Sequence, residues 1–383
     1  MRKRRNYFLV GVAFLLAISC QQSTEEHDSI SLPDMEEFRS EMDGKEITLY
    51  HLKNEQGMEA AFTNFGARIV SLIVPDKDGV LRDVVLGFNK GSDYHNSEEP
   101  FFGPIVGPYA NRISQGKFQL DDEEYQLQIN NEPNTLHGGF DGLHFQVWDT
   151  EVLSEDSIAF TCKLPDGKEG FPGNRKLKVT YSLSPDNELV IDYWGTTDKK
   201  TILNLTNHAY FNLNGEGSGA ILNHKLQIFA DSFTPVNQTL IPTGEIKNVV
   251  GSPFDFTELK EIGLDIDLES EQLRYGKGYD HNFVLNDHSV KDGYRNACVL
   301  IGDKSGIRME IQTQEPGLQF YSGNFMADKV TLKNGKTDSF RTALCLEPQH
   351  FPDAPNQPDF PSTVLEEGKE YKTSSIYKFS IEK

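Results

Sequence analysis

The chain has 383 residues, and 58 Asp and Glu outnumber 37 Lys and Arg, which gives a formal net charge of −21. Such an acidic surface repels nucleic acids and anionic lipid headgroups, so we expect no nucleic-acid partner. It also disfavours phosphorylated substrates, because no local cluster of Arg and Lys overrides the field. Four cysteines are too few for a disulfide framework in a chain of this length.

The N-terminal residues have the pattern of an export signal. Basic residues 2–5 precede a run from Tyr7 to Ile18 that is apolar apart from one Gly, and Ser19 and Cys20 follow it. This run is too short to span a bilayer as a helix but is typical of the apolar region of a signal peptide. A small residue before a Cys resembles the cleavage point of a bacterial lipoprotein.

We therefore expect residues 1–19 to be a signal peptide of the lipoprotein type, with Cys20 lipidated after cleavage. The protein would be exported and lipid-anchored to the cell envelope, in the periplasm or at the outer membrane, with no other membrane contact. The alternative is an ordinary signal peptide in which Cys20 is incidental. Residues 20–45 are polar and acidic, which predicts a flexible tether, and residues 46–383 are expected to form a single domain.

Residues 46–383 contain short segments of β type separated by turn residues. Polar and apolar side chains alternate over 176–183, 126–129 and 308–313, as in strands with one buried face. Turn signals such as Asp166-Gly167 and Asn214-Gly215 recur between such segments. The fold class predicted is therefore all-β, a large antiparallel β-sandwich. The only helix candidates are short, such as 256–260.

Five prolines between residues 348 and 361 indicate a rigid loop or a sheet edge, because proline cannot donate to a central ladder. This segment follows directly after Glu347. Two interpretations remain open, namely a loop that frames a pocket and an ordinary surface crossing.

Three short motifs carry side chains suited to proton transfer. His208 lies in Asn204–Leu213, His137 is followed by Gly138 and Gly139, and Glu347 lies between apolar residues. Two imidazoles and a carboxylate suffice for acid and base catalysis near neutral pH without a metal or an organic cofactor. We expect a partly buried Glu347 to have a raised pKa, which suits a base. The alternatives are purely structural roles, namely a buried core histidine for His208 and an ion pair at a strand end for Glu347. The two glycines after His137 would let the backbone approach a ligand closely.

Together with further motifs in the same order, these segments resemble the aldose 1-epimerase (galactose mutarotase) family over about residues 46–380. The matching segments are Asn64–Ala67, Asp83–Phe88, Gly107–Ile113, Asn134–Gly139, Glu169–Asn174, Asn204–Leu213, Tyr279–Phe283, Gln319–Asn324 and Leu346–Gln349.

The resemblance implies a large β-sandwich with a sugar site on the concave face of one sheet, and interconversion of the α and β anomers of free aldoses such as galactose and glucose. It implies that His208 is the proton donor, Glu347 the proton acceptor and His137 a hydrogen-bond donor to the ring-oxygen region. The substrate-binding residues expected are Asn111, Arg112, His137, His208, Tyr210, Asp280 and Gln319. Phe320 is a further candidate for an apolar face against the sugar.

Three alternatives use the same residues differently. A glycoside hydrolase would use Glu347 and Asp280 as a carboxylate pair, which leaves the histidines without a role. A carbohydrate-binding module would bind without catalysis and would not need the acid and base set. A zinc hydrolase would ligate a metal with His137, His208 and Glu347, but no short ligand spacing such as H-E-x-x-H is present.

We expect no cofactor to be needed and assign no metal ligand. Acidic loops leave Ca2+ possible in principle. The default expectation for the oligomeric state is a monomer.

Overall fold

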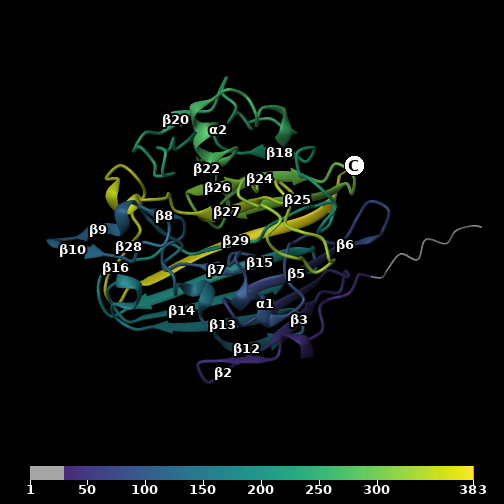
Figure 1. The fold of residues 1–383 in the computed structure, drawn as a ribbon, viewed down its shortest axis with the longest axis horizontal. Coiled ribbons are helices and arrows are strands. Elements are labelled where there is room, and N and C mark those ends of the chain that lie inside the picture. Colours follow the sequence, from purple (N-terminus) through teal and green to yellow (C-terminus); the bar gives the residue numbers. More distant parts are fainter. Residues whose placement is uncertain (1–29, 288, 383) are drawn as a thin grey trace, which may run out of the picture.

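The computed structural model describes residues 30–287 and 289–382 (Figure 1). The predicted signal peptide and the lipidated Cys20 lie outside these residues. Within the described part, no helix is long and apolar enough to cross a membrane.

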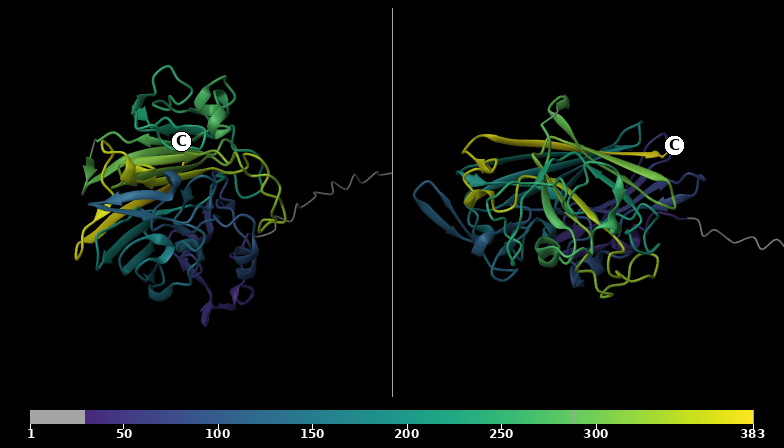
Figure 2. Two further views of the ribbon diagram at one scale, coloured as in Figure 1. Left: turned by 60° about the vertical axis from the view of Figure 1, so that its left-hand side comes forward. Right: turned by 90° about the horizontal axis from the view of Figure 1, so that it is seen from above.

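Ten strands form the largest sheet, and every pairing between its strands is antiparallel. Their order is β12-β13-β14-β15-β29-β25-β24-β18-β21, and β23 pairs with β24. The strands are β12 (Asp149–Ser154), β13 (Ser157–Leu164), β14 (Arg175–Leu183), β15 (Glu188–Thr197), β18 (Lys225–Ile228), β21 (Lys260–Glu261), β23 (Ser289–Lys291), β24 (Tyr294–Ile301), β25 (Ile307–Thr313) and β29 (Glu370–Ile381). The predicted strands 176–183 and 308–313 are confirmed as β14 and β25. Figure 2 shows the long strand β29 along one side of the molecule in the view from above.

Two smaller sheets complete the sandwich, one of five strands in the order β20-β19-β22-β26-β27 and one of four in the order β3-β4-β5-β6. The first contains β19 (Ser232–Phe233), β20 (Lys247–Asn248), β22 (Asp280–Val284), β26 (Gly317–Tyr321) and β27 (Cys345–Gln349). The second contains β3 (Leu49–Lys53), β4 (Glu59–Thr63), β5 (Arg68–Pro75) and β6 (Leu81–Asp83). These sheets are also antiparallel, so the predicted all-β antiparallel class is confirmed.

Short strand pairs and single helical turns fill the connections. The pairs are β1 (Ser40–Met42) with β2 (Lys45–Ile47), β7 (Ile105–Val106) with β17 (Thr206–Asn207), β8 (Arg112–Ile113) with β11 (Thr135–Leu136), β9 (Lys117–Leu120) with β10 (Glu123–Gln126), and β16 (Thr201–Ile202) with β28 (Val364–Leu365). The α-helices are α1 (Gly91–Asn96) and α2 (Glu271–Gly276). The 3-10 turns are η1 (Glu36–Phe38), η2 (Ser114–Gly116), η3 (Leu143–Phe145), η4 (Lys168–Gly170), η5 (Ile262–Leu264) and η6 (Ala354–Asn356).

Two local predictions are wrong. Residues 256–260 are not helical, because the Asp255 carboxylate accepts hydrogen bonds from the Thr257 N–H (3.2 Å) and hydroxyl (2.6 Å), a local turn that competes with a helix. Of the predicted strand 126–129, only Gln126 belongs to a strand. The Leu127 N–H still bonds to the carbonyl of Gly116, the next residue in register (2.7 Å), but Gly116 belongs to the turn η2, so the partner strand ends there.

Part of the segment predicted as a flexible tether, residues 20–45, is folded in the described structure. η1 and the β1–β2 hairpin form there, and the Phe38 side chain is 0% exposed. Its ring lies 6.2 Å from that of Tyr94 in a buried apolar cluster. Burial of a whole phenylalanine outweighs the polar composition around it, so the folded region begins near residue 36.

Aromatic contacts join the sheets into one core. The rings of Phe62 in β4 and Tyr181 in β14 are 4.6 Å apart, and the Tyr181 hydroxyl donates to the Ala67 carbonyl at 2.8 Å. Tyr377 in β29 packs on Phe211 at 5.9 Å. Since side chains alternate along a strand, β26 and β27 bury Phe320 and Leu346 in this core and turn Tyr321 and Glu347 to the opposite face.

Candidate functional site

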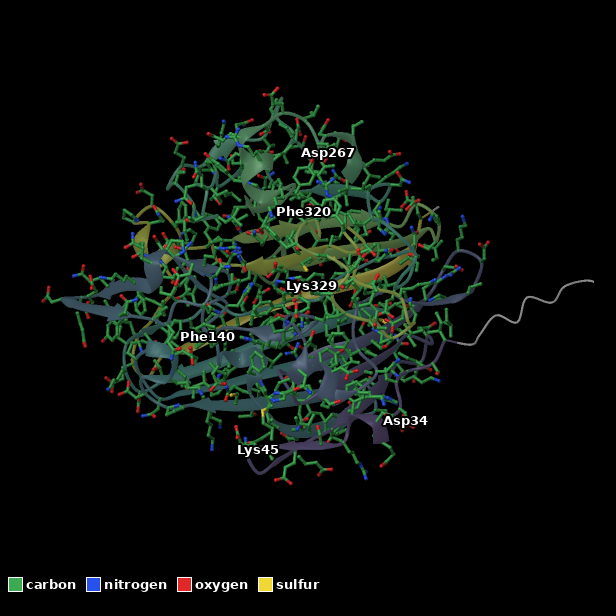
Figure 3. The ribbon with its side chains drawn as sticks, viewed as in Figure 1. Asp34, Lys45, Phe140, Asp267, Phe320 and Lys329 are labelled. Atoms are coloured by element: carbon green, nitrogen blue, oxygen red, sulfur yellow. The ribbon has the colours of Figure 1, made fainter. Side chains whose placement is uncertain are left out.

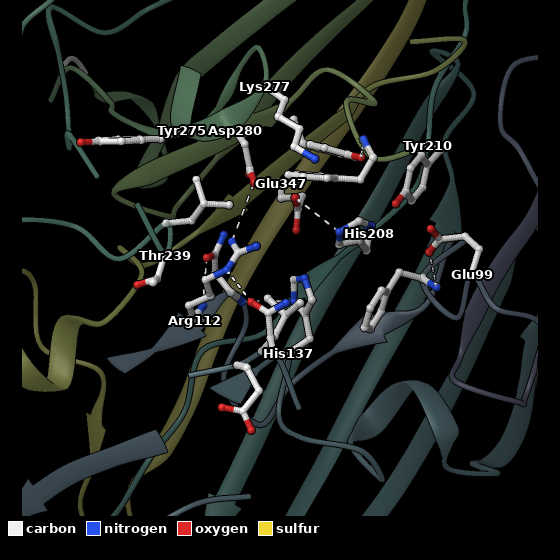
Figure 4. Close-up of a pocket in the computed structure, with 18 of the residues that line it drawn as sticks. Glu99, Arg112, His137, His208, Tyr210, Thr239, Tyr275, Lys277, Asp280 and Glu347 are labelled. Carbon is white, nitrogen blue, oxygen red and sulfur yellow. Dashed lines mark hydrogen bonds and ion pairs between the residues drawn. The ribbon is translucent and has the colours of Figure 1, made fainter. Parts of the chain in front are cut away.

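A pocket of about 450 Å³ opens on that opposite face (Figure 4), within the size range of small-molecule sites. Its wall comes from three neighbouring strands, β22, β26 and β27, and from the loops around β8, β11 and β17. The lining residues are Glu99, Phe101, Asn111, Arg112, Asn131, Glu132, Leu136, His137, His208, Tyr210, Gln238, Thr239, Leu240, Tyr275, Lys277, Asp280, Tyr321, Phe325 and Glu347.

Glu347 and His208 face each other in the pocket. Glu347 is in β27, His208 directly follows β17, and Glu347 Oε1 lies 3.7 Å from His208 Nε2. Both side chains are buried. Burial, and then the charge of Asp280, raise the pKa of Glu347 well above its ordinary range, and burial lowers the pKa of His208 to about 4. Both shifts disfavour the charged form, as expected when an acid and a base lose contact with water.

One oxygen of the Glu347 carboxyl is unsatisfied. Oε2 has no hydrogen-bond partner in the described part of the chain, although it is buried. Such a group costs free energy unless a ligand or a water molecule completes it.

His137 is fixed by the backbone of Asn111. The Asn111 N–H donates to His137 Nδ1 at 3.1 Å, and the His137 N–H donates to the Asn111 carbonyl at 3.0 Å. Because Nδ1 accepts, the neutral ring carries its proton on Nε2. Burial, and then the neighbouring His208, lower the pKa of His137 well below its ordinary value, so this ring is a neutral hydrogen-bond donor. Both Asn111 (φ 63°) and His137 (φ 51°) have left-handed backbone, a strain found at functional sites.

The glycines after His137 approach other parts of the chain and do not line the pocket, which differs from the expectation from sequence. A Cβ on Gly138 would lie 2.1 Å from the Gly107 carbonyl oxygen, and one on Gly139 would lie 2.2 Å from Glu169 Oε2. Both glycines have positive φ. The Gly-Gly pair therefore allows two loops to touch and so places His137. Phe140, next in the chain, is 59% exposed (Figure 3).

A second polar cluster lies beside Glu347. Arg112 Nη1 is 3.8 Å from Asp280 Oδ2, and the Arg112 Nε–H donates to Asn131 Oδ1 at 3.1 Å. Gln319 was expected in the substrate site but does not line the pocket. Its amide instead donates to Asp280 Oδ1 at 2.6 Å, so it holds this carboxylate from behind.

The apolar part of the wall differs from the prediction. Tyr210 lines the pocket as expected, but Phe320 points into the core and packs on Tyr279 at 5.2 Å. Phe101 takes its place, with its ring 4.8 Å from that of His137 and 5.7 Å from that of His208.

Several wall residues carry no sequence signal that marks them. One of them is Glu99, whose pKa is raised to about 7 by burial. One of its carboxylate oxygens accepts a hydrogen bond from the Phe101 N–H at 3.0 Å. Tyr275 and Lys277 come from α2 and its C-cap, which precede the Tyr279–Phe283 motif and lie just outside it. Phe101 follows Pro100 just before the Gly107–Ile113 motif, and aromatic character near that motif was the only available hint.

The proline-rich segment supports the pocket from outside and does not line it. The Asp353 N–H donates to the Arg112 carbonyl at 2.8 Å, and Asp353 Oδ1 accepts the Ser114 N–H at 2.9 Å.

Within residues 30–287 and 289–382, no group of three or more His, Cys, Asp or Glu side chains is placed to hold a metal ion. The ligand set of a zinc hydrolase is therefore not assembled by His137, His208 and Glu347.

The chain matches the family model for aldose 1-epimerase over residues 48–378. It belongs to the aldose 1-epimerase family. It is 41% identical to a galactose mutarotase of Rattus norvegicus over 339 residues, which are 88% of this chain and 95% of the relative. It is 36% identical to an aldose 1-epimerase of Escherichia coli K12 over 342 residues, 89% and 97% of the two chains.

Solved structures agree with this assignment. An aldose epimerase homologue from C. elegans superposes with a TM-score of 0.81 at 32% identity and covers 88% of this chain and 99% of its own. A galactose 1-epimerase from Lactobacillus acidophilus reaches 0.78 at 28% identity and covers 90% and 97%. The family resemblance and the fold that it implied are confirmed.

Gly138→Ala tests whether the close approach of the two loops places His137. The added methyl group meets the Gly107 carbonyl, so we expect a loss of stability of about 1–3 kcal/mol and a displaced imidazole. Chemical denaturation measures the loss of stability, and the His137 NMR signals report the ring. Gly335→Ala is the matched control, since its φ is also positive (76°) but its Cβ meets no atom within 4 Å. Equal effects of the two substitutions would contradict the account.

Proposed function

We propose that this protein interconverts the α and β anomers of free aldoses, with Glu347 as the base and His208 as the acid. The observation that carries the proposal is the buried Glu347–His208 contact of 3.7 Å in a pocket lined by hydrogen-bonding groups, in a chain of the aldose 1-epimerase family. The family assignment favours this reaction over the glycoside hydrolase and the binding module.

Opening of the sugar ring needs one proton removed and one supplied. The Glu347 carboxylate takes the proton of the C1 hydroxyl, and the His208 imidazolium gives a proton to the ring oxygen as the C1–O5 bond breaks. Rotation about C1–C2 and the reverse transfers then produce the other anomer. Acid and base catalysis of this kind each contribute roughly 10²–10⁴-fold.

The proton count of the Glu347–His208 pair stays constant through this cycle. Before opening the pair is carboxylate and imidazolium, and after opening it is carboxylic acid and imidazole, so it holds one exchangeable proton in both states. Before substrate binds, burial favours the uncharged form, because it raises the pKa of Glu347 and lowers that of His208. Sugar hydroxyls that donate to the carboxylate stabilise the charged form when substrate is bound.

Arg112, Asp280 and Asn111 are proposed to bind the remaining hydroxyls, and His137 to donate its Nε2–H near the ring oxygen. Asp280 and Arg112 supply an acceptor and forked donors side by side, a pairing suited to vicinal hydroxyl groups. Gln319 acts through Asp280. The relatives are named for galactose and for aldoses in general, so we propose galactose and glucose as substrates.

Polarimetry tests the proposed function directly. With freshly dissolved α-D-galactose or α-D-glucose, the wild-type protein should accelerate the relaxation of optical rotation. Glu347→Gln and His208→Asn should each lower kcat by roughly 10²–10⁴-fold, because each removes one proton-transfer group.

Glu132→Gln is the control for this experiment. Glu132 also lines the pocket and loses a charge in the same way, but it has no proposed part in proton transfer. It should retain most of the wild-type rate. A wild-type protein that accelerates relaxation of no common aldose, or a folded Glu347→Gln variant of full activity, would overturn the proposal.

The pH dependence follows from the shared proton. Below the pKa of His208, about 4, the pair takes up a second proton and loses its base, so kcat/KM should fall with a midpoint near that value. Above the raised pKa of Glu347 the pair loses its proton and its acid, so activity should fall again. Initial rates corrected for spontaneous mutarotation measure both limbs. An acid limb near 6.5, the ordinary pKa of histidine, would contradict this assignment.

We also propose that Cys20 anchors the protein to the bacterial cell envelope, on the basis of the sequence before it. Expression in a bacterial host with a radiolabelled fatty acid should label the wild-type protein and place it in the membrane fraction. Cys20→Ser should remove both the label and the membrane association. Equal labelling of the two proteins would exclude Cys20 as the lipidated residue.

A further inference from the structure

The same strand contacts both nitrogens of the catalytic imidazole. In β27, Glu347 Oε1 lies 3.7 Å from His208 Nε2, and Cys345 Sγ lies 3.6 Å from His208 Nδ1. The two residues are separated by one position, so the alternation of the strand puts them on one face. The spacing along β27 thus matches the two sides of one ring.

Cys345 is held firmly in this place. Its side chain is 0% exposed and belongs to the apolar cluster that contains Tyr210 and Tyr321. It is in backbone register with Tyr321 in β26. Burial, and then the charge of Glu347, raise the pKa of the Cys345 thiol well above its ordinary value, so it remains a thiol and takes no part in proton transfer.

The chemistry decides which nitrogen of the neutral ring is protonated. To exchange a proton with Glu347 or the sugar, Nε2 must present a lone pair in the neutral state, so the resting proton belongs on Nδ1.

We propose that Cys345 is a positioning residue whose sulfur accepts the Nδ1–H of His208 and thereby leaves Nε2 as the nitrogen that exchanges the proton. This inference rests on the proposed function, because it assigns a partner to the proposed acid.

A sulfur acceptor suits this role better than a carboxylate. A carboxylate on Nδ1 would stabilise the imidazolium strongly, as in a Ser-His-Asp triad. A thiol sulfur is a weak acceptor that orients the ring but adds little stabilisation of the charged form. His208 therefore keeps its low pKa of about 4 and returns its proton readily within the pair.

NMR of the histidine ring tests the orientation without turnover. In protein labelled with ¹⁵N and ¹³C on histidine, the unliganded wild type at neutral pH should show the Nδ1–H tautomer for His208, assigned with His208→Asn. Cys345→Ala should shift the ring toward a mixture of tautomers. Cys345→Ser keeps an acceptor at the same position and should retain the Nδ1–H form.

Kinetics on the same variants give a second readout. Cys345→Ala should lower kcat roughly tenfold with little change in KM, because the ring is misaligned while the sugar contacts remain. Cys345→Ser should recover most of that loss. Cys298→Ala is the matched control, since Cys298 is also a buried free cysteine in a strand, but it lies in β24 of the large sheet. It should leave both tautomer and kcat unchanged.

Three results would overturn the inference: an Nε2–H tautomer in the wild type, a Cys345→Ala variant with unchanged tautomer, or one with unchanged kcat. If Cys345→Ala does not fold, the wild-type spectrum and Cys345→Ser decide, since an Nε2–H ring in either contradicts the role of the sulfur. Failure of the proposed function is a separate result, namely a wild type that accelerates no aldose, and the NMR spectrum remains interpretable in that case.

Discussion

The proposed reaction depends on the burial of an acid and a base side by side. Glu347 is 2% exposed and His208 is 6% exposed, and each loses hydration that its charged form would need. Burial raises the pKa of Glu347 and lowers that of His208, and the proposed mechanism uses these shifts to let one proton pass between the two groups. The proposed reaction removes a proton from the C1 hydroxyl and supplies one to the ring oxygen. It therefore needs a pair that can exchange a proton more than it needs a strong acid or a strong base.

The β-sandwich supplies this environment through strands that are buried on both faces. All five residues of β26 and all five of β27 are buried. One face of these strands packs with Tyr377 and the large sheet, and the other carries Glu347 and Cys345. A rigid core on one side thus fixes Glu347 and Cys345 on the other, while His208 and His137 come from the loops that follow β17 and β11.

Sequence patterns anticipated the parts of this site that lie in short, distinctive motifs. Glu347, His208 and His137 were found because an ionisable residue stood in an apolar or glycine-rich context, and Arg112 and Asp280 because the family motifs included them. The alternation in 176–183 and 308–313 predicted two strands of the large sheet, since period two is a direct consequence of strand geometry. Buried residues near the N-terminus were missed, because a single Phe38 in an acidic segment shows no periodicity.

What sequence could not supply is the pairing of distant segments. Phe101 lies against His137 and His208 only because separate loops meet, and Gln319 turns to Asp280 because of the register between β22 and β26. Phe320 was misassigned because an aromatic side chain in a strand can point to either face of the sheet. Only the alternation of side chains along β26 decides between the core and the pocket. The contact of Cys345 with His208 joins residues 137 positions apart, and no local sequence pattern predicts it.

The most direct measurement of the account is a joint NMR titration of the Glu347 carboxyl and the His208 ring in the unliganded protein. A desolvated pair predicts that Glu347 titrates well above its ordinary value of 4.5 and His208 near 4. Replacement of His208 by Asn should leave the raised titration of Glu347 in place, since burial is its main cause. Ordinary values near 4.5 for Glu347 and 6.5 for His208 would show that the pocket is solvated and would contradict the shared-proton mechanism.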